Sequence, residues 1–66
     1  MRTLTVDFNG VRDSTVVGLL RTMEGHPNLG ERVWLTDGEH RAQGSVLEVG
    51  DHLVKAQVDM GTWETR

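Results

Sequence analysis

The three histidines are the residues best suited to chemistry, because histidines with nearby carboxylates can bind a metal ion. His26, His40 and His52 all lie in turn-rich segments, with aspartates or glutamates near the last two. His40 and His52 lie at opposite ends of a predicted strand of about eight residues, which places them about 26 Å apart. Two ligands cannot share one metal ion over that distance. We therefore predict no metal site and interpret the histidines as solvated turn residues.

The sequence also lacks the usual patterns for a nucleophile or a phosphate site. Ser14 and Ser45 have no histidine near them in the sequence, and the chain has no cysteine. Neither glycine-rich phosphate motif, GxxxxGK[ST] or GxGxxG, occurs. So short a chain has little room for the cleft that hydrolysis by two carboxylates requires. We predict that the protein is not an enzyme and binds no cofactor.

The net charge of the chain indicates which classes of partner are unlikely. Ten acidic residues exceed seven lysines and arginines, which gives a formal net charge of -3 at pH 7. Nucleic-acid binders concentrate positive charge, so this balance argues against generic nucleic-acid binding. No segment is apolar enough to span a membrane, and the first residues lack a signal-peptide pattern. We expect a cytoplasmic protein with no membrane partner.

The elements that must position any binding residue are predicted to be β-strands. Residues 31–37, 41–49 and 52–59 alternate between apolar and polar side chains, with turn residues between the segments. This pattern is typical of an antiparallel meander. A further alternating segment, residues 3–8, is followed by Asn9-Gly10, a strong signal for a two-residue hairpin turn. We therefore expect the chain from Val11 onward to pair with the first strand.

Residues 14–24 allow two interpretations. Four apolar residues have the spacing of one helix face: Val16, Leu19, Leu20 and Met23. Against a helix, Thr15, Val16 and Val17 are β-branched, and Gly18 would lie in the helix interior. We favour a strand over residues 11–22, bent or bulged at Gly18; a helix would make the domain α+β.

Five short strands in this length predict an all-β fold for a single domain, residues 1–66. Because closure hides strand edges, we expect a small five-stranded antiparallel barrel, or a strongly curled sheet, of SH3-like or OB-like type. Trp63 is expected to fold back over an open end of the core.

One family resemblance supports a barrel. Glycines and aliphatic residues recur in Val17-Gly18-Leu19, in Leu29-Gly30-Glu31-Arg32-Val33-Trp34-Leu35 and in Ala42-Gln43-Gly44-Ser45-Val46. This spacing resembles the β-barrel second domain of translation GTPases. The resemblance implies a barrel and assigns no functional residue.

The outer face of the meander carries the pattern that points to function. If Val33 and Leu35 face the core, Trp34 between them faces outward. The same alternation turns Leu47 and Leu53 outward, so the three side chains are expected to form one external apolar patch. Outward tryptophan is typical of a protein interface. Alternatively, a curled sheet, loop 25–30 or the Trp63 tail covers them.

Two functions follow from this face. The first is a non-enzymatic protein-interaction module, self-associating or an accessory subunit, whose partner is a second copy or another protein. Its interface candidates are Trp34, Leu47, Leu53 and Arg32. The alternative is a nucleic-acid- or ribosome-associated small β-barrel, in which Arg32 and Arg41 beside Trp34 would bind single-stranded nucleic acid.

Overall fold

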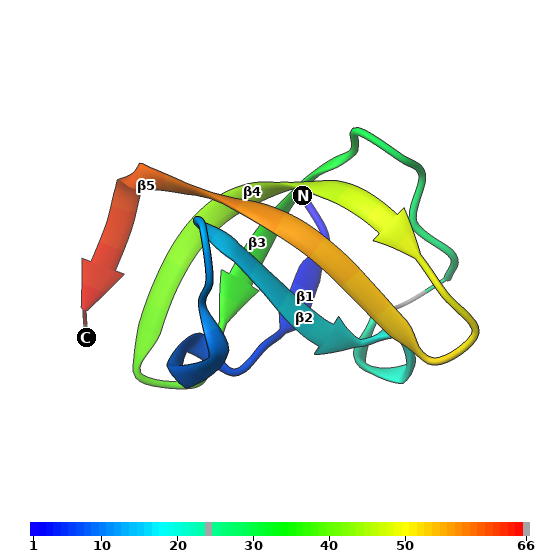
Figure 1. Cartoon of the computed structure of the whole chain (residues 1–66), viewed down its shortest axis with the longest axis horizontal. Helices are drawn as coiled ribbons and strands as arrows, with labels where there is room; N and C mark the ends of the chain where they lie inside the picture. Colours follow the sequence, from blue (N-terminus) through cyan, green and yellow to red (C-terminus); the bar gives the residue numbers. More distant parts are fainter. Residues whose placement is uncertain (24, 66) are drawn as a thin grey trace.

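The protein folds as one mixed five-stranded sheet that curls into a half-barrel (Figure 1). This computed structural model describes residues 1–23 and 25–65; Glu24, the end of the segment with two interpretations, and Arg66 lie outside them. The strands are β1 (Thr3–Thr5), β2 (Thr15–Leu19), β3 (Arg32–Thr36), β4 (His40–Val49) and β5 (Leu53–Thr65), with 3-10 turns η1 (Phe8–Gly10) and η2 (Leu20–Thr22). The sheet order is β1-β3-β4-β5-β2. The predicted all-β class is therefore confirmed.

The predicted meander is β3, β4 and β5, and both of its pairs are antiparallel. The Asp37 carboxylate stabilises the β3–β4 turn by accepting hydrogen bonds from the backbone N–H groups of Glu39 and His40, at 2.9 and 2.7 Å. Gly38 has a φ of 98°, which glycine adopts without steric cost. Local turn chemistry thus produces the hairpin where the sequence predicted it.

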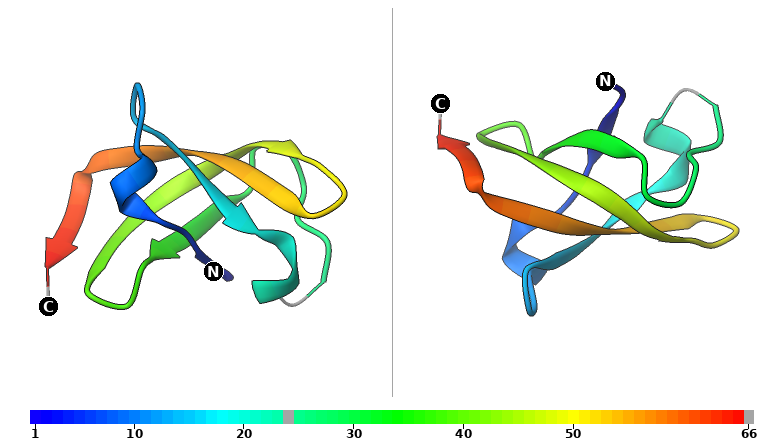
Figure 2. Two further views of the ribbon diagram at one scale, coloured as in Figure 1. Left: turned by 60° about the horizontal axis from the view of Figure 1, so that its bottom comes forward. Right: turned by 90° about the horizontal axis from the view of Figure 1, so that it is seen from above.

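The hairpin predicted at Asn9-Gly10 is wrong. These residues belong to η1, and the Asp7 side chain caps that turn by accepting a hydrogen bond from the Asn9 N–H. The tight reversal lies at Asp13 and Ser14, the two non-glycine residues with positive φ in the described part of the chain, at 51° and 61°. Two positive φ angles in succession are typical of a type I′ turn. The loop containing this reversal projects from the barrel in both views of Figure 2.

One pair of strands departs from the predicted antiparallel arrangement. β1 runs parallel to β3, in a register from Thr3 opposite Trp34 to Thr5 opposite Thr36. The reversal at Asp13-Ser14 leads the chain into β2, which pairs with β5 at the other edge of the sheet. β1 therefore has no hairpin partner and pairs with the free edge of β3.

The chain at the end of β1 passes close to β2, and a glycine makes that contact possible. An isolated bridge joins Val6 to Gly18. A Cβ atom on Gly18 would lie 2.5 Å from the Thr5 carbonyl oxygen and 2.7 Å from Leu4 Cγ. Only a residue without a side chain lets the two strands come this close.

The strand interpretation of residues 14–24 is confirmed for Thr15–Leu19, and the described residues contain no α-helix. The strand is shorter than the predicted 11–22, because η2 begins at Leu20. The Thr22 hydroxyl supports that turn by donating a hydrogen bond to the Leu19 carbonyl at 2.7 Å.

The inner face of the sheet forms the core. The buried apolar residues are Leu4, Val6, Val16, Met23, Val33, Leu35, Ala42, Val46, Val54, Ala56 and Val58. Leu47 is an extra residue in β4 between the pairs Val46–Ala56 and Glu48–Lys55. This bulge returns Val49 to the inner face, where it packs against the core.

β5 is longer than predicted and bends sharply near its end (Figures 1 and 2). Gln43 pairs with Asp59 and Arg41 pairs with Glu64, so the single residue Ala42 of β4 faces residues 60–63 of β5. The extra residues turn the end of the chain across the barrel opening.

Candidate functional site: the outer face of the sheet

Trp34 lies on the outer side of β3, between Thr3 of β1 and Gln43 of β4. It is half-buried. The guanidinium carbon of Arg41 lies 4.5 Å from the centre of the indole ring, at the distance of a cation–π contact. The ring is therefore covered on one side by a neighbouring side chain of the same sheet.

The two arginines near Trp34 are both paired with carboxylates. Arg32 Nη2 lies 2.6 Å from Asp59 Oδ2, and Arg41 Nη2 lies 2.7 Å from Glu64 Oε2. The hydrogen bond from Arg32 is the main reason why the pKa of the Asp59 carboxyl is lowered. This part of the outer face is consequently a set of neutral ion pairs rather than a positively charged surface.

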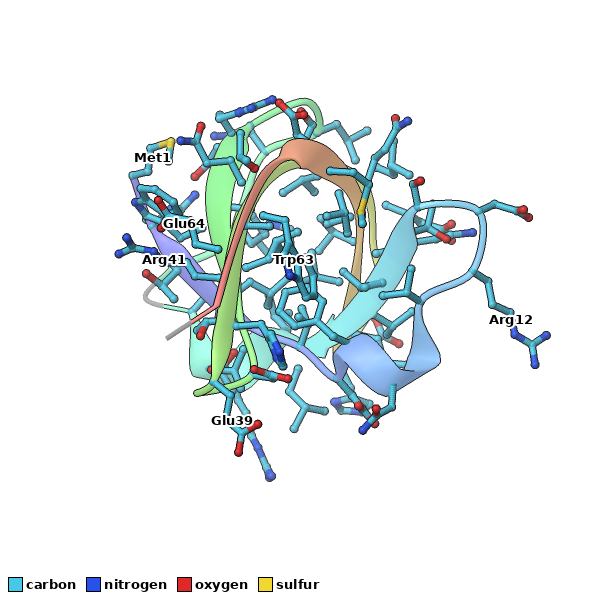
Figure 3. All side chains as sticks on the ribbon, turned by 90° about the vertical axis from the view of Figure 1, so that its left-hand side faces the viewer. Met1, Arg12, Glu39, Arg41, Trp63 and Glu64 are labelled. Carbon is cyan, nitrogen blue, oxygen red and sulfur yellow. The ribbon has the colours of Figure 1, made fainter. Side chains whose placement is uncertain are left out.

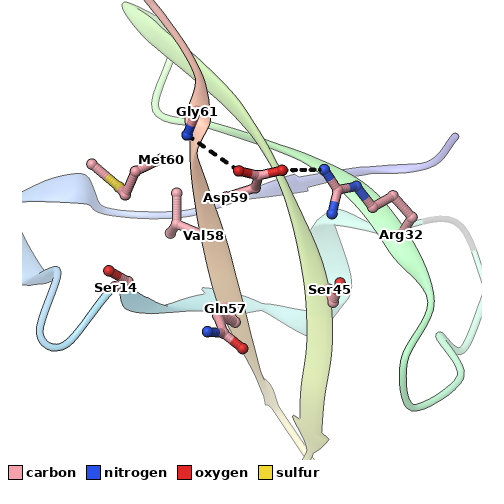
Figure 4. Close-up of a pocket in the computed structure, with 8 residues that line it drawn as sticks. All are labelled: Ser14, Arg32, Ser45, Gln57, Val58, Asp59, Met60 and Gly61. Carbon is pink, nitrogen blue, oxygen red and sulfur yellow. Dashed lines mark hydrogen bonds and ion pairs between the residues drawn. The ribbon is translucent and has the colours of Figure 1, made fainter.

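Asp59 also connects Arg32 to the bend in β5. Its Oδ1 atom accepts a hydrogen bond from the Gly61 N–H at 3.2 Å, on the side of the carboxylate away from Arg32 (Figure 4). These residues border an open, largely polar hollow of about 530 Å³. Both partners of the ion pair are nearly half exposed, so the hollow holds no buried charge awaiting a ligand.

The largest group of exposed apolar side chains lies on β2 and β5. Val17, Leu19 and Leu53 are 46%, 40% and 50% exposed. Leu19 is directly opposite Leu53, and Val17 is opposite Lys55. We call these three residues the β2–β5 patch. Sequence reasoning found Leu53 but missed Val17 and Leu19, because their position beside it depends on a pairing between distant segments.

A second exposed apolar group lies on the other side of β4. Leu29 is 71% exposed and Leu47 is 44% exposed. Together they line a hollow of about 420 Å³ with His26, Pro27, Asn28, Glu48 and Val49. We call these two leucines the Leu29–Leu47 pair. Both groups lie at the end of the barrel formed by the β4–β5 turn, here called the hairpin end.

Two of the three predicted patch residues, Leu47 and Leu53, both lie at the hairpin end, but in different apolar groups. Trp34 pairs with Gln43, which in turn pairs with Asp59 of β5. Asp59 is six residues along β5 from Leu53, so Trp34 is about 20 Å from Leu53 in the direction of the strands. A role for any of these residues in an interface stays a prediction.

The opposite end of the barrel is closed by aromatic rings, as predicted for Trp63. The Trp63 ring stacks on His40 with centroids 5.1 Å apart and meets the edge of Phe8 at 4.7 Å. Trp63 also packs against the core, and Figure 3 shows it across the opening of the curved sheet. We call Phe8, His40 and Trp63 the aromatic end.

The acidic residues with shifted pKa values have structural partners. Glu31 is held by Arg2, which lowers the pKa of its carboxyl to about 2. The backbone N–H groups of His40 and Glu39 lower the pKa of Asp37, and His40 Nδ1 lies 3.3 Å from Asp37 Oδ2. Each shift is explained by a turn or an ion pair, without any ligand.

No group of three metal-binding side chains occurs among the described residues. In the same part of the chain, no helix has both the length and the apolar character needed to cross a membrane.

Comparisons with models of protein families, with curated proteins and with solved structures found no match. The resemblance to the second domain of translation GTPases therefore stays a prediction, and function is argued from the geometry of the outer face.

Proposed function

We propose that the protein is a non-enzymatic interaction module that binds a second copy of itself or another protein through the hairpin end. The β2–β5 patch is the observation that carries this proposal. Single exposed apolar residues are common on protein surfaces, but adjacent ones on paired strands leave continuous apolar area in water. Burying that area against a partner removes it from water.

The patch lies outside a core that other residues form. Each of the five strands contributes buried apolar residues to that core, and Val17, Leu19 and Leu53 are not among them. On their strands they alternate with the buried residues Gly18 and Val54, so their side chains face away from the core. This is the position expected of a contact surface.

Trp34 and Arg32 lie outside the proposed surface. Arg41 covers one side of the Trp34 ring, and Asp59 neutralises Arg32. Because Arg41 is paired as well, the arrangement does not favour the nucleic-acid alternative, which needs free cations beside an accessible ring. The proposal keeps the expected cytoplasmic location, which the absence of cysteine favours, and a barrel of SH3-like or OB-like type.

The proposal is tested with Leu53→Ser and a matched control, Met60→Ser. The two side chains are equally exposed, at 50% and 51%, and both lie on β5, but Met60 lies at the distant bend. Self-association is measured by sedimentation over a range of concentrations, and capture of other proteins by affinity purification with quantitative mass spectrometry.

We expect Leu53→Ser to abolish an association that Met60→Ser retains. Thermal unfolding must show that both variants are folded. The proposal is wrong if two results occur together: the wild-type chain does not self-associate, and Leu53→Ser captures every protein that the wild-type chain captures.

A further inference from the structure

The hairpin end carries two apolar groups with two charged residues between them. Glu48 on β4 and Lys55 on β5 are directly opposite in the register, and both are exposed. Neither takes part in the four ion pairs found among the described residues. A negative and a positive side chain thus lie next to each other, each able to accept a partner of opposite charge.

The two apolar groups lie on opposite sides of this charged pair. The β2–β5 patch lies on the β2 side of the charged pair, because Val17 of β2 is directly opposite Lys55 of β5. The segment with Leu29 is on the β3 side, because Gly30 and Glu31 hydrogen-bond to the Val46 backbone at 2.7 and 3.0 Å. Figure 1 shows the same succession, from the 25–31 segment through β4 and β5 to β2.

This order is self-complementary. A two-fold axis lying in the contact plane and running between β4 and β5 exchanges the two sides of the surface. It brings the patch of one copy onto the Leu29–Leu47 pair of the other, and Lys55 of each copy onto Glu48 of the other. Apolar area then meets apolar area, and each charge meets its opposite.

Surface hollows fit the same arrangement. The Leu29–Leu47 pair borders the hollow of about 420 Å³, and a second hollow of about 280 Å³ is lined by Val17, Glu48, Gly50, Leu53 and Lys55. Each apolar group therefore lies beside a depression of the surface into which side chains of the other copy can project.

The area required also favours the whole end over the patch alone. The protein exposes 4306 Å², and a standard interface buries about 800 Å² on each partner, roughly a fifth of that surface. Three partly exposed side chains cannot supply this area, whereas both apolar groups together with Glu48 and Lys55 span the end of the barrel.

We propose that the partner is a second copy of this chain, bound two-fold through the hairpin end with Glu48 of each copy on Lys55 of the other. This inference rests on the proposed function and adds the identity and orientation of the partner.

The test uses Glu48→Lys, Lys55→Glu and their equimolar mixture, with dissociation constants measured by sedimentation from about 1 µM to about 1 mM, the range of weak dimers. Each single reversal places like charges at both symmetric contacts, so we expect each to weaken self-association about tenfold or more. In the mixture, a heterodimer again has opposite charges at both contacts and should form with an affinity close to that of the wild type.

Glu39→Lys is the matched control, since it makes the same charge change in the β3–β4 turn at the other end. It should leave the dimer intact. Circular dichroism and thermal unfolding check that each reversed variant is folded. Among folded variants, reversals that leave the affinity unchanged, or a mixture that does not restore it, overturn the two-fold arrangement.

The outcomes separate this inference from the proposed function. A wild-type chain that stays monomeric to about 1 mM, while Leu53→Ser loses capture of a different protein, overturns the inference and leaves the proposed function standing. If the wild-type chain stays monomeric and Leu53→Ser loses capture of no protein, both the two-fold dimer and the proposed function are contradicted.

Discussion

The two ends of this half-barrel differ in whether their apolar side chains are covered or exposed to solvent. At the aromatic end, β5 bends so that Trp63 packs on Phe8 and His40 and covers the core. At the hairpin end, Leu29, Leu47 and Leu53 remain in solvent, as do Val17 and Leu19. The same 66 residues close one opening with their own side chains and leave apolar residues outside the other.

The difference is informative because a chain of this size has little stability to spare. The aromatic end shows that the fold can cover apolar surface by extending a strand. The hairpin end lacks any such extension among the described residues. This difference supports the proposal that a partner covers the exposed groups of the hairpin end.

The largest expected effect is on the fold that carries both ends, at the close approach of β1 to β2 beside Gly18. A Cβ atom there would lie 2.5 Å from a backbone oxygen, which cannot move aside without displacing β1. We expect Gly18→Ala to lower the free energy of unfolding by about 3 kcal/mol. Urea denaturation measures this, with Gly10→Ala as control because nothing lies within 4 Å of its Cβ. Equal stability of the two variants would show that this contact is looser than described.

A direct comparison of the ends uses Trp63→Ala and Leu53→Ala. Trp63 packs on the core, so its loss should reduce the free energy of unfolding by about 2 kcal/mol, less than the roughly 3–5 kcal/mol of a fully buried tryptophan. Leu53 is half exposed, so its truncation should change the stability of the monomer by less than about 0.5 kcal/mol. Denaturation at low protein concentration measures both values. A larger loss at Leu53 would mean that the hairpin end is part of the core.

A smaller effect is expected from acid. Arg2 lowers the pKa of the Glu31 carboxyl from 4.5 to about 2. Because the pKa is lower in the folded state, this contact stabilises the fold fully above pH 4.5, and its contribution is lost as the pH falls toward 2. Melting temperatures across that interval should decline less steeply for Glu31→Gln than for the wild type. Glu39→Gln, an exposed acid outside the ion pairs and outside the proposed dimer contact, is the control; the same change of slope in both variants would contradict this assignment.

Much of the sheet could be predicted because its information is local. Alternation identified β3, β4 and most of β5, together with the inward direction of Val33 and Leu35. The Asp37 turn was equally readable, since its carboxylate bonds to residues two and three positions later. These features depend on neighbours within a few residues.

The N-terminal pairings were mispredicted because they depend on distant partners. Asn9-Gly10 has the composition of a hairpin turn, but Phe8–Gly10 forms a 3-10 turn instead, and Phe8 packs against Trp63 near the other end of the chain. The positive φ angles fall on Asp13 and Ser14, a pair with a weaker signal.

The candidate surface was only partly readable for the same reason. Leu47 and Leu53 followed from alternation, whereas the bulge at Leu47 that returns Val49 to the core was not predicted. Val17 and Leu19 join Leu53 only through the β2–β5 pairing. The cover that Arg41 places on Trp34 likewise depends on the register between β3 and β4.

The parallel pairing of β1 has a consequence for the order of folding. Thr3 pairs with Trp34, 31 residues later in the chain (34 − 3), whereas β3, β4 and β5 are joined by short turns. During synthesis β1 leaves the ribosome before β3, so it has no partner strand until about thirty more residues have been made, and its pairing is less local than the hairpins of the meander. We expect β1 to dock after the meander has formed, and until then the β3 edge and the Leu4 side chain are open to a second nascent or newly released chain.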